Sequence, residues 1–351
     1  MKHTEELLEK LSNAHGISGF EGNIRKIFED ELTPYVDSIT TDKMGNIVAT
    51  KKGSGPSVMI AAHMDEIGLM VKYIDENGFL RFVKIGGWFD PTIHSQRVII
   101  HSKKGEIKGV IGSKPPHVMK EEDRKKPPKA EDMFIDIGVT TKEEAEGLGV
   151  EVGSPISLDR HYSKLANNIV TGKAFDDRVG LVILIQVLKE LSTKNIGLTI
   201  HGVGTVQEEV GLKGARVAAF GLNPDIALIT ETTIAGDYPG IDKKDSAIEV
   251  GKGSAITIVD AAGRGLIANQ KIIEWLRTTA DENNINYQMD VADGGTTDAT
   301  AIHITKEGIP SGVLSIPTRY IHSPVEVLSL DDIDSCIDFI LKSFDNIEKF
   351  F

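Results

Sequence analysis

Histidines and carboxylates that can bind metal ions or transfer protons recur at the predicted ends of strands and at the start of one helix. They are His63 and Asp65 in AAHMDEIG, Asp176 and Asp177 in AFDDRVG, Glu208 and Glu209 in VQEEVG, Glu231 in LITETT and His322 in RYIHSP. Each motif alone has an ordinary reading, such as a helix cap or a solvated acid pair. Their recurrence in equivalent places indicates a shared site.

The residue types suit two adjacent divalent cations. Imidazole combined with carboxylate, without thiolate, favours zinc, cobalt or manganese. Two adjacent ions need one bridging carboxylate and terminal ligands on each side, and the attacking water needs a base. Consecutive residues that leave a strand point in different directions, so Glu208 and Glu209 are suited to divided roles, one as base and one as ligand.

His63 and Asp65 follow the apolar run Val58–Ala62, which predicts a short buried strand. Residues two apart share a face in an extended segment. We therefore expect the Asp65 carboxylate to accept the imidazole N–H that His63 does not use on a metal, which would fix the ring.

Alternating strands and helices must position these residues. We predict strands at 58–62, 197–206, 224–230 and 309–316, and helices at 177–191, 213–220, 266–283 and 329–344. Such alternation predicts an α/β fold with a mostly parallel central sheet flanked by helices. Ligands of open α/β sheets bind at the carboxyl ends of the strands, where the clustered residues are expected.

A β-rich segment interrupts this pattern. Short apolar runs separated by Gly, Asn and Asp turns predict a small inserted β-barrel or sandwich at 69–160. The predicted division is therefore 1–68 and 161–351 for the two parts of the α/β domain, and 69–160 for the insertion. Within the insertion, the charged and proline-rich stretch 115–129 is expected to be a mobile surface loop.

Composition narrows the possible partners. The 351 residues are 40% hydrophobic and 26% charged, with a net charge of −13, which argues against nucleic acid or an anionic membrane as a partner. No apolar run approaches the roughly 20 residues that span a bilayer. The single cysteine, Cys336, excludes an internal disulfide framework and lies at helical spacing among isoleucines, as a buried thiol would. The cytoplasm is the expected compartment.

The motifs AAHMDEIG, AFDDRVG, VQEEVGLKGA and RYIHSP, in this order and with the insertion after the first, resemble those of the tetrahedral (TET) or glutamyl aminopeptidases, which are di-metal exopeptidases. The resemblance runs from the first helix to the last and includes IGSKPPH and GGTTDATAI. It implies a zinc-peptidase type of α/β fold with an inserted β-barrel.

The resemblance also assigns roles. It implies that His63 and Glu231 bind the first metal and that Asp65 orients His63. Asp176 would bridge both ions, and the peptide bond between this residue and Asp177 is often cis in the family. Glu209 and His322 would bind the second metal, and Glu208 would be the general base and acid. The family more often has Asp where this chain has Glu231, which is a departure. Gly294, Gly295, Thr296 and Asp298 resemble a substrate loop beside the cleft, although a glycine turn before the 299–305 segment is an equal alternative.

The implied reaction is removal of the N-terminal residue from short peptides with two divalent ions per subunit, zinc or cobalt, with manganese possible. In the family, the inserted domain pairs subunits and the dimers build a hollow homododecamer. The 115–129 loop would then border a neighbour's cleft.

Three alternatives stay open. The same di-metal chemistry serves amidases and carboxypeptidases. An endoglucanase would need an isolated carboxylate pair and aromatic sugar platforms, whereas here the acids are matched by histidines and aromatic residues make up 6% of the chain. A non-catalytic assembly module would not need the base, yet Glu208 is present.

Overall fold

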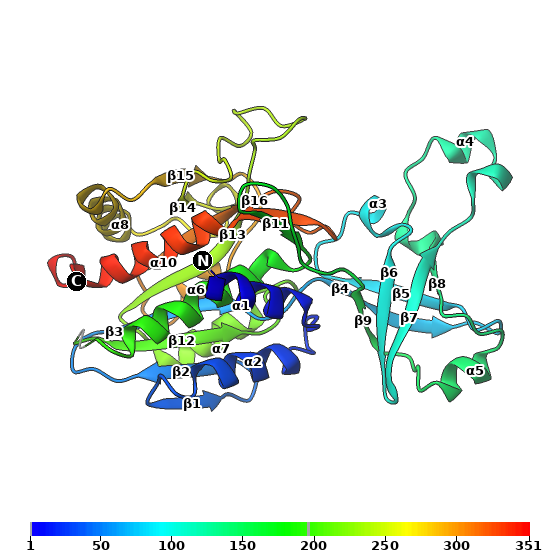
Figure 1. The fold of residues 1–351 in the computed structure, drawn as a ribbon, viewed down its shortest axis with the longest axis horizontal. Coiled ribbons are helices and arrows are strands. Elements are labelled where there is room, and N and C mark those ends of the chain that lie inside the picture. Colours follow the sequence, from blue (N-terminus) through cyan, green and yellow to red (C-terminus); the bar gives the residue numbers. More distant parts are fainter. Residues whose placement is uncertain (1, 195–196) are drawn as a thin grey trace.

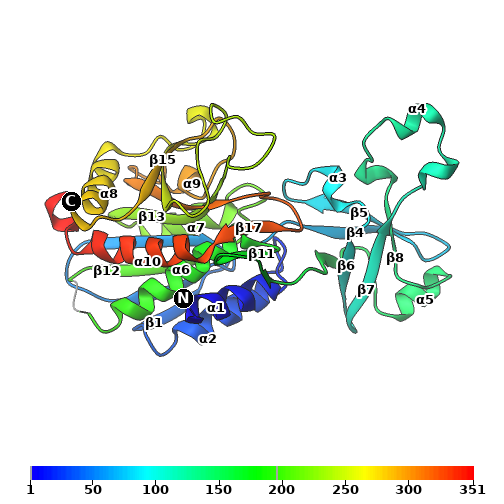
Figure 2. The same cartoon turned by 45° about the horizontal axis from the view of Figure 1, so that its top comes forward.

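The protein consists of an α/β body and a closed β-barrel that projects from one end of it (Figure 1). The computed structural model describes residues 2–194 and 197–351. Turning the molecule by 45° leaves the barrel at the same end, away from both chain termini (Figure 2). The fold class predicted from the sequence, an α/β sheet protein with an inserted β-barrel, is confirmed.

Eight strands form the central sheet among the described residues, in the order β1-β2-β12-β3-β13-β16-β14-β15. Their bounds are β1 Ser38–Thr41, β2 Ile47–Lys51, β3 Ser57–His63, β12 Thr199–Thr205, β13 Ile226–Ile234, β14 Ser254–Val259, β15 Tyr287–Val291 and β16 Ser311–Thr318. The four central strands β12, β3, β13 and β16 pair in parallel, so their carboxyl ends meet at one edge. Beside the sheet, β10 Ser163–Lys164, β11 Ile169–Gly172 and β17 Glu326–Ser329 form a small antiparallel sheet.

Strand β3 is apolar from Val58 to Ala62 because both faces of the sheet are covered. Val58, Ile60 and Ala62 belong to the core cluster on one side, whereas Met59 and Ala61 belong to the cluster on the other. This alternation follows from the period of two along a strand. It explains why the sequence shows one continuous apolar run that ends at the first polar residue, His63.

Helices cover both faces of the sheet. They are α1 Lys2–Asn13, α2 Gly22–Leu32, α6 Phe175–Leu191, α7 Lys213–Leu222, α8 Gln270–Asn283, α9 Ala299–Ile302 and α10 Leu330–Phe344, with 3-10 turns η3 Ala261–Gly263 and η4 Ile347–Lys349. Helix α6 is buried almost all round because α1, α2 and α10 pack over it, and it is correspondingly apolar on every side. In the part of the chain that is described, no helix combines the length and apolar character that crossing a membrane requires.

The barrel closes in the order β4-β5-β8-β7-β6-β9. Its strands are β4 Gly68–Ile74, β5 Leu80–Ile85, β6 Arg97–Ser102, β7 Gly105–Gly112, β8 Phe134–Asp136 and β9 Pro155–Leu158. Between the strands lie the short helices α3 Asp90–Ile93, α4 Glu121–Arg124 and α5 Lys142–Gly147 and the 3-10 turns η1 Pro116–Val118 and η2 Ala130–Asp132. The charged stretch 115–129 contains η1 and α4, and its described side chains are largely exposed. It projects from the barrel, away from the α/β body (Figure 1).

Two strands of the sheet, β14 and β15, were not predicted from the sequence. Strand β14 pairs with β16 in the antiparallel direction, and β1 and β2 add two more antiparallel pairs, so the sheet is parallel only in its centre and at the β14–β15 pair. Helix α8 begins at Gln270 rather than near Leu266, because the Asn269 side chain caps it by accepting the Lys271 N–H. Cys336 is fully buried, as predicted, and burial raises the pKa of its thiol to about 12.

Candidate metal centre

The clustered residues come from five separate segments that meet at the carboxyl edge of the parallel strands. His63 is the last residue of β3, and Glu231 lies in the second half of β13. Glu208 and Glu209 follow β12, and Asp176 stands at the start of α6; His322 follows β16. The sheet therefore brings together side chains that are up to 259 positions apart in the chain (322 − 63).

The first group of candidate metal ligands is His63, Asp176 and Glu231, all buried. The Nε2 atom of His63 lies 3.1 Å from Asp176 Oδ1 and 3.6 Å from Glu231 Oε1. Among the described residues, Glu231 Oε2 is buried without a hydrogen-bond partner. A carboxylate oxygen that is buried and unsatisfied costs free energy unless a cation binds it, so this group fits a metal ion.

The second group is Asp176, Glu209 and His322. The Nε2 atom of His322 lies 3.3 Å from Asp176 Oδ2 and 3.2 Å from Glu209 Oε2. The His322 side chain is 36% exposed, so this group faces the solvent side of the site. Asp176 thus directs one carboxylate oxygen to each imidazole, and it is the residue that the two groups share.

Glu208 borders these groups without belonging to either of them in the described structure. Its Oε2 lies 3.9 Å from His63 Nε2, and the residue is 8% exposed. Burial raises the pKa of the Glu208 carboxyl well above its usual value. A carboxyl group with a raised pKa, close to the ligands but outside them, holds a proton more readily than a free carboxyl group and is suited to general acid and base chemistry.

Buried carboxylates outnumber imidazoles in this cluster. Burial raises the pKa of Glu209 to about 7, and it also raises that of Asp177. Although burial opposes it, hydrogen bonding to Asp176 and Glu209 raises the pKa of His322 to about 12. These raised pKa values mean that protons on the carboxyl groups and imidazoles offset the excess negative charge of the cluster. This is the expected behaviour of a site that binds cations.

Two oxygen atoms of Asp65 lie near the Nδ1 atom of His63. The backbone carbonyl oxygen is 3.0 Å away, and the carboxylate Oδ1 is 3.6 Å away. The carbonyl is the nearer of the two because β3 ends at His63, so the chain is not extended through Asp65. Both contacts are made by Nδ1, so they orient the ring and leave Nε2 free for a metal.

The Asp65 carboxylate also holds the loop that carries the two glutamates. It accepts the Ser18 hydroxyl at 2.6 Å and the N–H groups of Glu208 and Glu209 at 2.9 and 3.2 Å. Asp177 has a comparable place on the other side, where its carboxylate accepts the N–H of His63 at 3.2 Å. The peptide bond between Asp176 and Asp177 is cis, as the resemblance implied.

The predicted substrate loop divides into two parts. Gly294, Gly295 and Thr296 are exposed, and Thr296 Oγ1 lies 2.5 Å from Thr300 Oγ1. Asp298 is buried and accepts the hydroxyl of Thr205, while its Oδ1 has no hydrogen-bond partner in the described part of the chain. Burial raises the pKa of Asp298 to about 7. Only Asp298 of these four residues is buried beside the carboxyl edge of the sheet.

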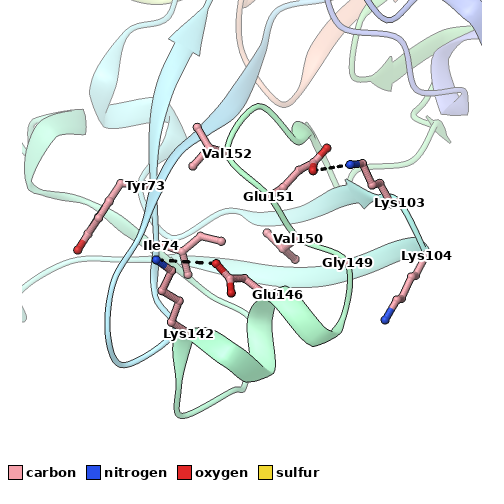
Figure 3. Close-up of a pocket in the computed structure, with 10 residues that line it drawn as sticks. All are labelled: Tyr73, Ile74, Lys103, Lys104, Lys142, Glu146, Gly149, Val150, Glu151 and Val152. Atoms are coloured by element: carbon pink, nitrogen blue, oxygen red, sulfur yellow. Dashed lines mark ion pairs between the residues drawn. The ribbon is translucent and has the colours of Figure 1, made fainter.

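A surface hollow of about 460 Å³ lies elsewhere, on the barrel (Figure 3). Its charged side chains already have partners: Lys103 pairs with Glu151 at 2.7 Å, Lys142 lies 3.8 Å from Glu146, and Lys104 donates to the carbonyl of Gly147. None of the clustered residues lines it. The clustered histidines and carboxylates therefore lie apart from this hollow.

Two curated relatives match nearly the whole chain. The lysyl aminopeptidase of Pyrococcus furiosus is 36% identical, covering 95% of this chain and 94% of the relative. The glutamyl aminopeptidase of Lactococcus lactis is 32% identical, covering 93% and 92%.

Solved structures agree with these matches. A TET aminopeptidase from a marine-sediment archaeon of the Thaumarchaeota superposes with a TM-score of 0.95 at 39% identity, covering 100% of this chain and 99% of that one. The TET1 peptidase of Pyrococcus horikoshii, described as assembling into a tetrahedron or a large octahedral shell, gives 0.88 at 33%, covering 97% and 98%. A structure described as an endoglucanase from Thermotoga maritima gives 0.78 at 32%, covering 97% and 99%.

A family model agrees with the site and with these relatives. Residues 45–339 match the model of the M42 glutamyl aminopeptidases, and this range includes every clustered residue. The chain therefore belongs to the M42 glutamyl aminopeptidase family.

Proposed function

We propose that this protein is a metal-dependent aminopeptidase that removes the N-terminal residue from short peptides and uses two divalent cations, zinc or cobalt, with manganese possible. The observation that carries the proposal is the shared carboxylate: Asp176 offers one oxygen to each of two histidine–carboxylate groups. Two adjacent ions require such a bridging ligand. When bound, the cations supply Lewis acidity, which polarises a carbonyl and lowers the pKa of water to about 7.

The proposed ligands are His63, Asp176 and Glu231 for one ion, and Asp176, Glu209 and His322 for the other. Glutamate in place of the more usual aspartate at 231 adds one methylene to the arm, and its Oε1 still reaches 3.6 Å from His63 Nε2. Asp65 is proposed to orient His63, whose Nδ1 lies 3.6 Å from its Oδ1, and to fix the loop of Glu208 and Glu209.

Glu208 is the proposed general base and acid. Its raised pKa suits acceptance of a proton from the attacking water and its return to the leaving amine. An exopeptidase must also bind the free amino terminus of its substrate. The buried carboxylate of Asp298, whose Oδ1 has no partner among the described residues, is the proposed contact from the 294–298 loop, with Gly294, Gly295 and Thr296 at its exposed rim.

The proposed organisation follows the sequence: a catalytic domain in two parts, 1–68 and 161–351, and a dimerisation domain, 69–160. We propose that dimers build a homododecamer, on the strength of the assembly described for the Pyrococcus horikoshii relative. The 115–129 loop is proposed to border a neighbouring subunit's cleft. A cytoplasmic location stays a prediction.

The test is a panel of aminoacyl-p-nitroanilides assayed with metal-stripped, zinc-loaded and cobalt-loaded protein, beside Glu208→Gln. Loss of the base is expected to lower kcat by about 10²–10⁴-fold. Glu282→Gln, an exposed carboxylate on α8, is the matched control and should retain full activity. Full turnover by the metal-stripped protein or by Glu208→Gln would exclude the proposed mechanism.

The same preparation separates the alternatives. An aminopeptidase cleaves the free aminoacyl substrate and rejects its N-acetylated form. A carboxypeptidase or amidase would accept the N-acetylated peptide instead. Release of reducing sugar from carboxymethyl cellulose would identify an endoglucanase.

A further inference from the structure

Glu326 is a buried carboxylate beside the metal centre and belongs to neither of the two groups of candidate ligands. It is the first residue of β17 and is 2% exposed. Its Oε2 accepts the backbone N–H of Asp176 at 3.1 Å, and its Oε1 accepts the backbone N–H of His322 at 3.0 Å. One carboxylate therefore joins the backbones of two candidate ligands that are 146 positions apart in the chain (322 − 176).

These two backbones need such support for different reasons. Asp176 carries the carboxylate that both ligand groups share, so a small shift of its main chain displaces both groups. His322 has a positive φ of 59°, a conformation that residues other than glycine seldom adopt and that persists only where the surroundings enforce it. The hydrogen bond from the His322 N–H to Glu326 is part of that enforcement.

The small sheet places Glu326 where it can reach both segments. Strand β17 pairs with β11, with Glu326 opposite Gly172, four residues before Asp176. On its other side, β17 follows the turn that contains His322. Strand β11 leads to Asp176, and the turn that contains His322 leads into β17. The Glu326 side chain joins these two segments by its hydrogen bonds to both residues.

We infer that Glu326 is a positioning residue, which fixes Asp176 relative to His322 and so sets the geometry of the second ligand group. This inference rests on the proposed metal-dependent function. A carboxylate is required because both partners are N–H donors: glutamine offers only one oxygen, and its amide group would direct N–H against N–H at the other position. Aspartate keeps both oxygens but is one methylene shorter.

The structure offers a matched control in Asp332. This residue is also 2% exposed, and its carboxylate likewise accepts two backbone N–H groups, those of Gly251 at 2.6 Å and Gly253 at 2.8 Å. Neither glycine is a candidate ligand. Asp332→Asn therefore removes the same kind of hydrogen bond without touching the metal centre, and it separates loss of stability from loss of positioning.

The experiment is a calorimetric titration of the metal-stripped full chain with zinc and with cobalt, together with thermal unfolding of the metal-stripped proteins. We expect Glu326→Gln to weaken binding of the second ion by about 10–100-fold, the usual effect of losing a residue that orients a ligand. Asp332→Asn should lower the unfolding temperature by about as much as Glu326→Gln does, but it should bind both metal ions with the affinity of the unsubstituted chain. Glu326→Asp should bind the second ion with an intermediate affinity. If Glu326→Gln does not fold, the metal affinity of Glu326→Asp tests the inference in its place.

Unchanged affinity in the folded Glu326 variants would overturn the inference, because the carboxylate would then serve stability alone. That result leaves the proposed function intact, since the unsubstituted chain would still bind two ions. If the unsubstituted chain binds no metal, the proposed function and the inference fail together.

Discussion

Asp176 divides its carboxylate between two imidazoles, and this single feature makes the two ligand groups dependent on each other. Its Oδ1 lies 3.1 Å from His63 and its Oδ2 lies 3.3 Å from His322. Glu231 and Glu209, by contrast, each belong to one group. The residues of the site should therefore differ in how many ions their substitution affects.

Substitution of these three carboxylates by amides should give three different metal contents. Glu231→Gln should retain the ion held by Asp176, Glu209 and His322, and Glu209→Gln should retain the other. Asp176→Asn should weaken both. Metal analysis after dialysis against a fixed free zinc concentration measures the stoichiometry, and equal losses in all three variants would contradict the division into two groups.

Metal affinity should rise with pH. In the metal-free protein the pKa of His322 is raised to about 12, so its ring holds a proton through the neutral range, and Glu209, with a pKa of about 7, holds one below neutrality. A metal ion must displace these protons, so higher pH favours binding. For one displaced proton, the affinity should increase about tenfold per pH unit. Cobalt titrations at pH 6.5 and 8.5 measure it, and an affinity independent of pH would contradict this account.

At the residue scale the sequence predicted which side chains meet, but not what each of them holds. His63, Asp176, Glu209, Glu231 and His322 were recognised because each stands next to an apolar run or a helix start. The further partners of Asp65, the N–H groups of Glu208 and Glu209, were not predicted because they belong to a loop 143 positions away. Glu326 was missed, although an acidic residue between two valines in VEVLS was an available signal.

Among the elements, the segment between β5 and α3 brings the barrel into contact with the metal centre. A Cβ added at Gly87 would lie 2.9 Å from Nδ1 of the His322 ring. The next residue, Trp88, is buried and donates its indole N–H to the carbonyl of Gly68 at 2.9 Å, which fixes this segment to β4. The barrel therefore supports one wall of the site.

Gly87→Ala should lower activity without a comparable loss of stability. The added methyl group is closer to the imidazole than real Cβ contacts allow, so the ring must move. A displacement of about 1 Å at a catalytic group can cost about 100-fold in rate. The kcat/KM of Gly87→Ala measures the effect.

Gly147→Ala provides the control, because a Cβ at this barrel position meets nothing within 4 Å. Its activity should equal that of the unsubstituted protein. Equal activity in both variants would show that the ring does not depend on the barrel segment.

Elements with strong periodicity were predictable, whereas β14 and β15, at one end of the sheet, were not. The continuous apolar run of β3 and the spacing of Ile333, Cys336 and Ile340 in α10 identify a buried strand and a helix packed on the core. Strand β15 forms the edge of the sheet with β14 beside it, and β15 mixes partly buried, exposed and buried residues without a clear alternation. Such short strands have weak patterns, and no local pattern reveals that β14 pairs with β16 in the antiparallel direction.

In the whole molecule, the barrel projects from the body and carries apolar side chains on its surface. Tyr73 and Val152 are 50% and 65% exposed, Val110 is 49% exposed, and Phe89 is 67% exposed. Tyr73 and Val152 line the same hollow on the barrel, and contiguous exposed apolar surface is typical of a site that associates with another subunit. This agrees with the proposed role of residues 69–160 in dimerisation.

The protein should therefore exceed the mass of one chain in solution. Twelve copies of the 38.1 kDa chain give about 457 kDa (12 × 38.1), and a dimer about 76 kDa (2 × 38.1). Sedimentation velocity of the metal-loaded protein measures this mass. A single species of 38.1 kDa at micromolar concentration would contradict the proposed assembly.

The most direct measurement of the central claim is an anomalous diffraction map from crystals of the zinc- or cobalt-loaded chain. We expect two peaks about 3.5–4 Å apart, one next to His63 and Glu231, the other next to Glu209 and His322, with Asp176 between them. A single peak, or two peaks that do not share Asp176, would contradict this claim.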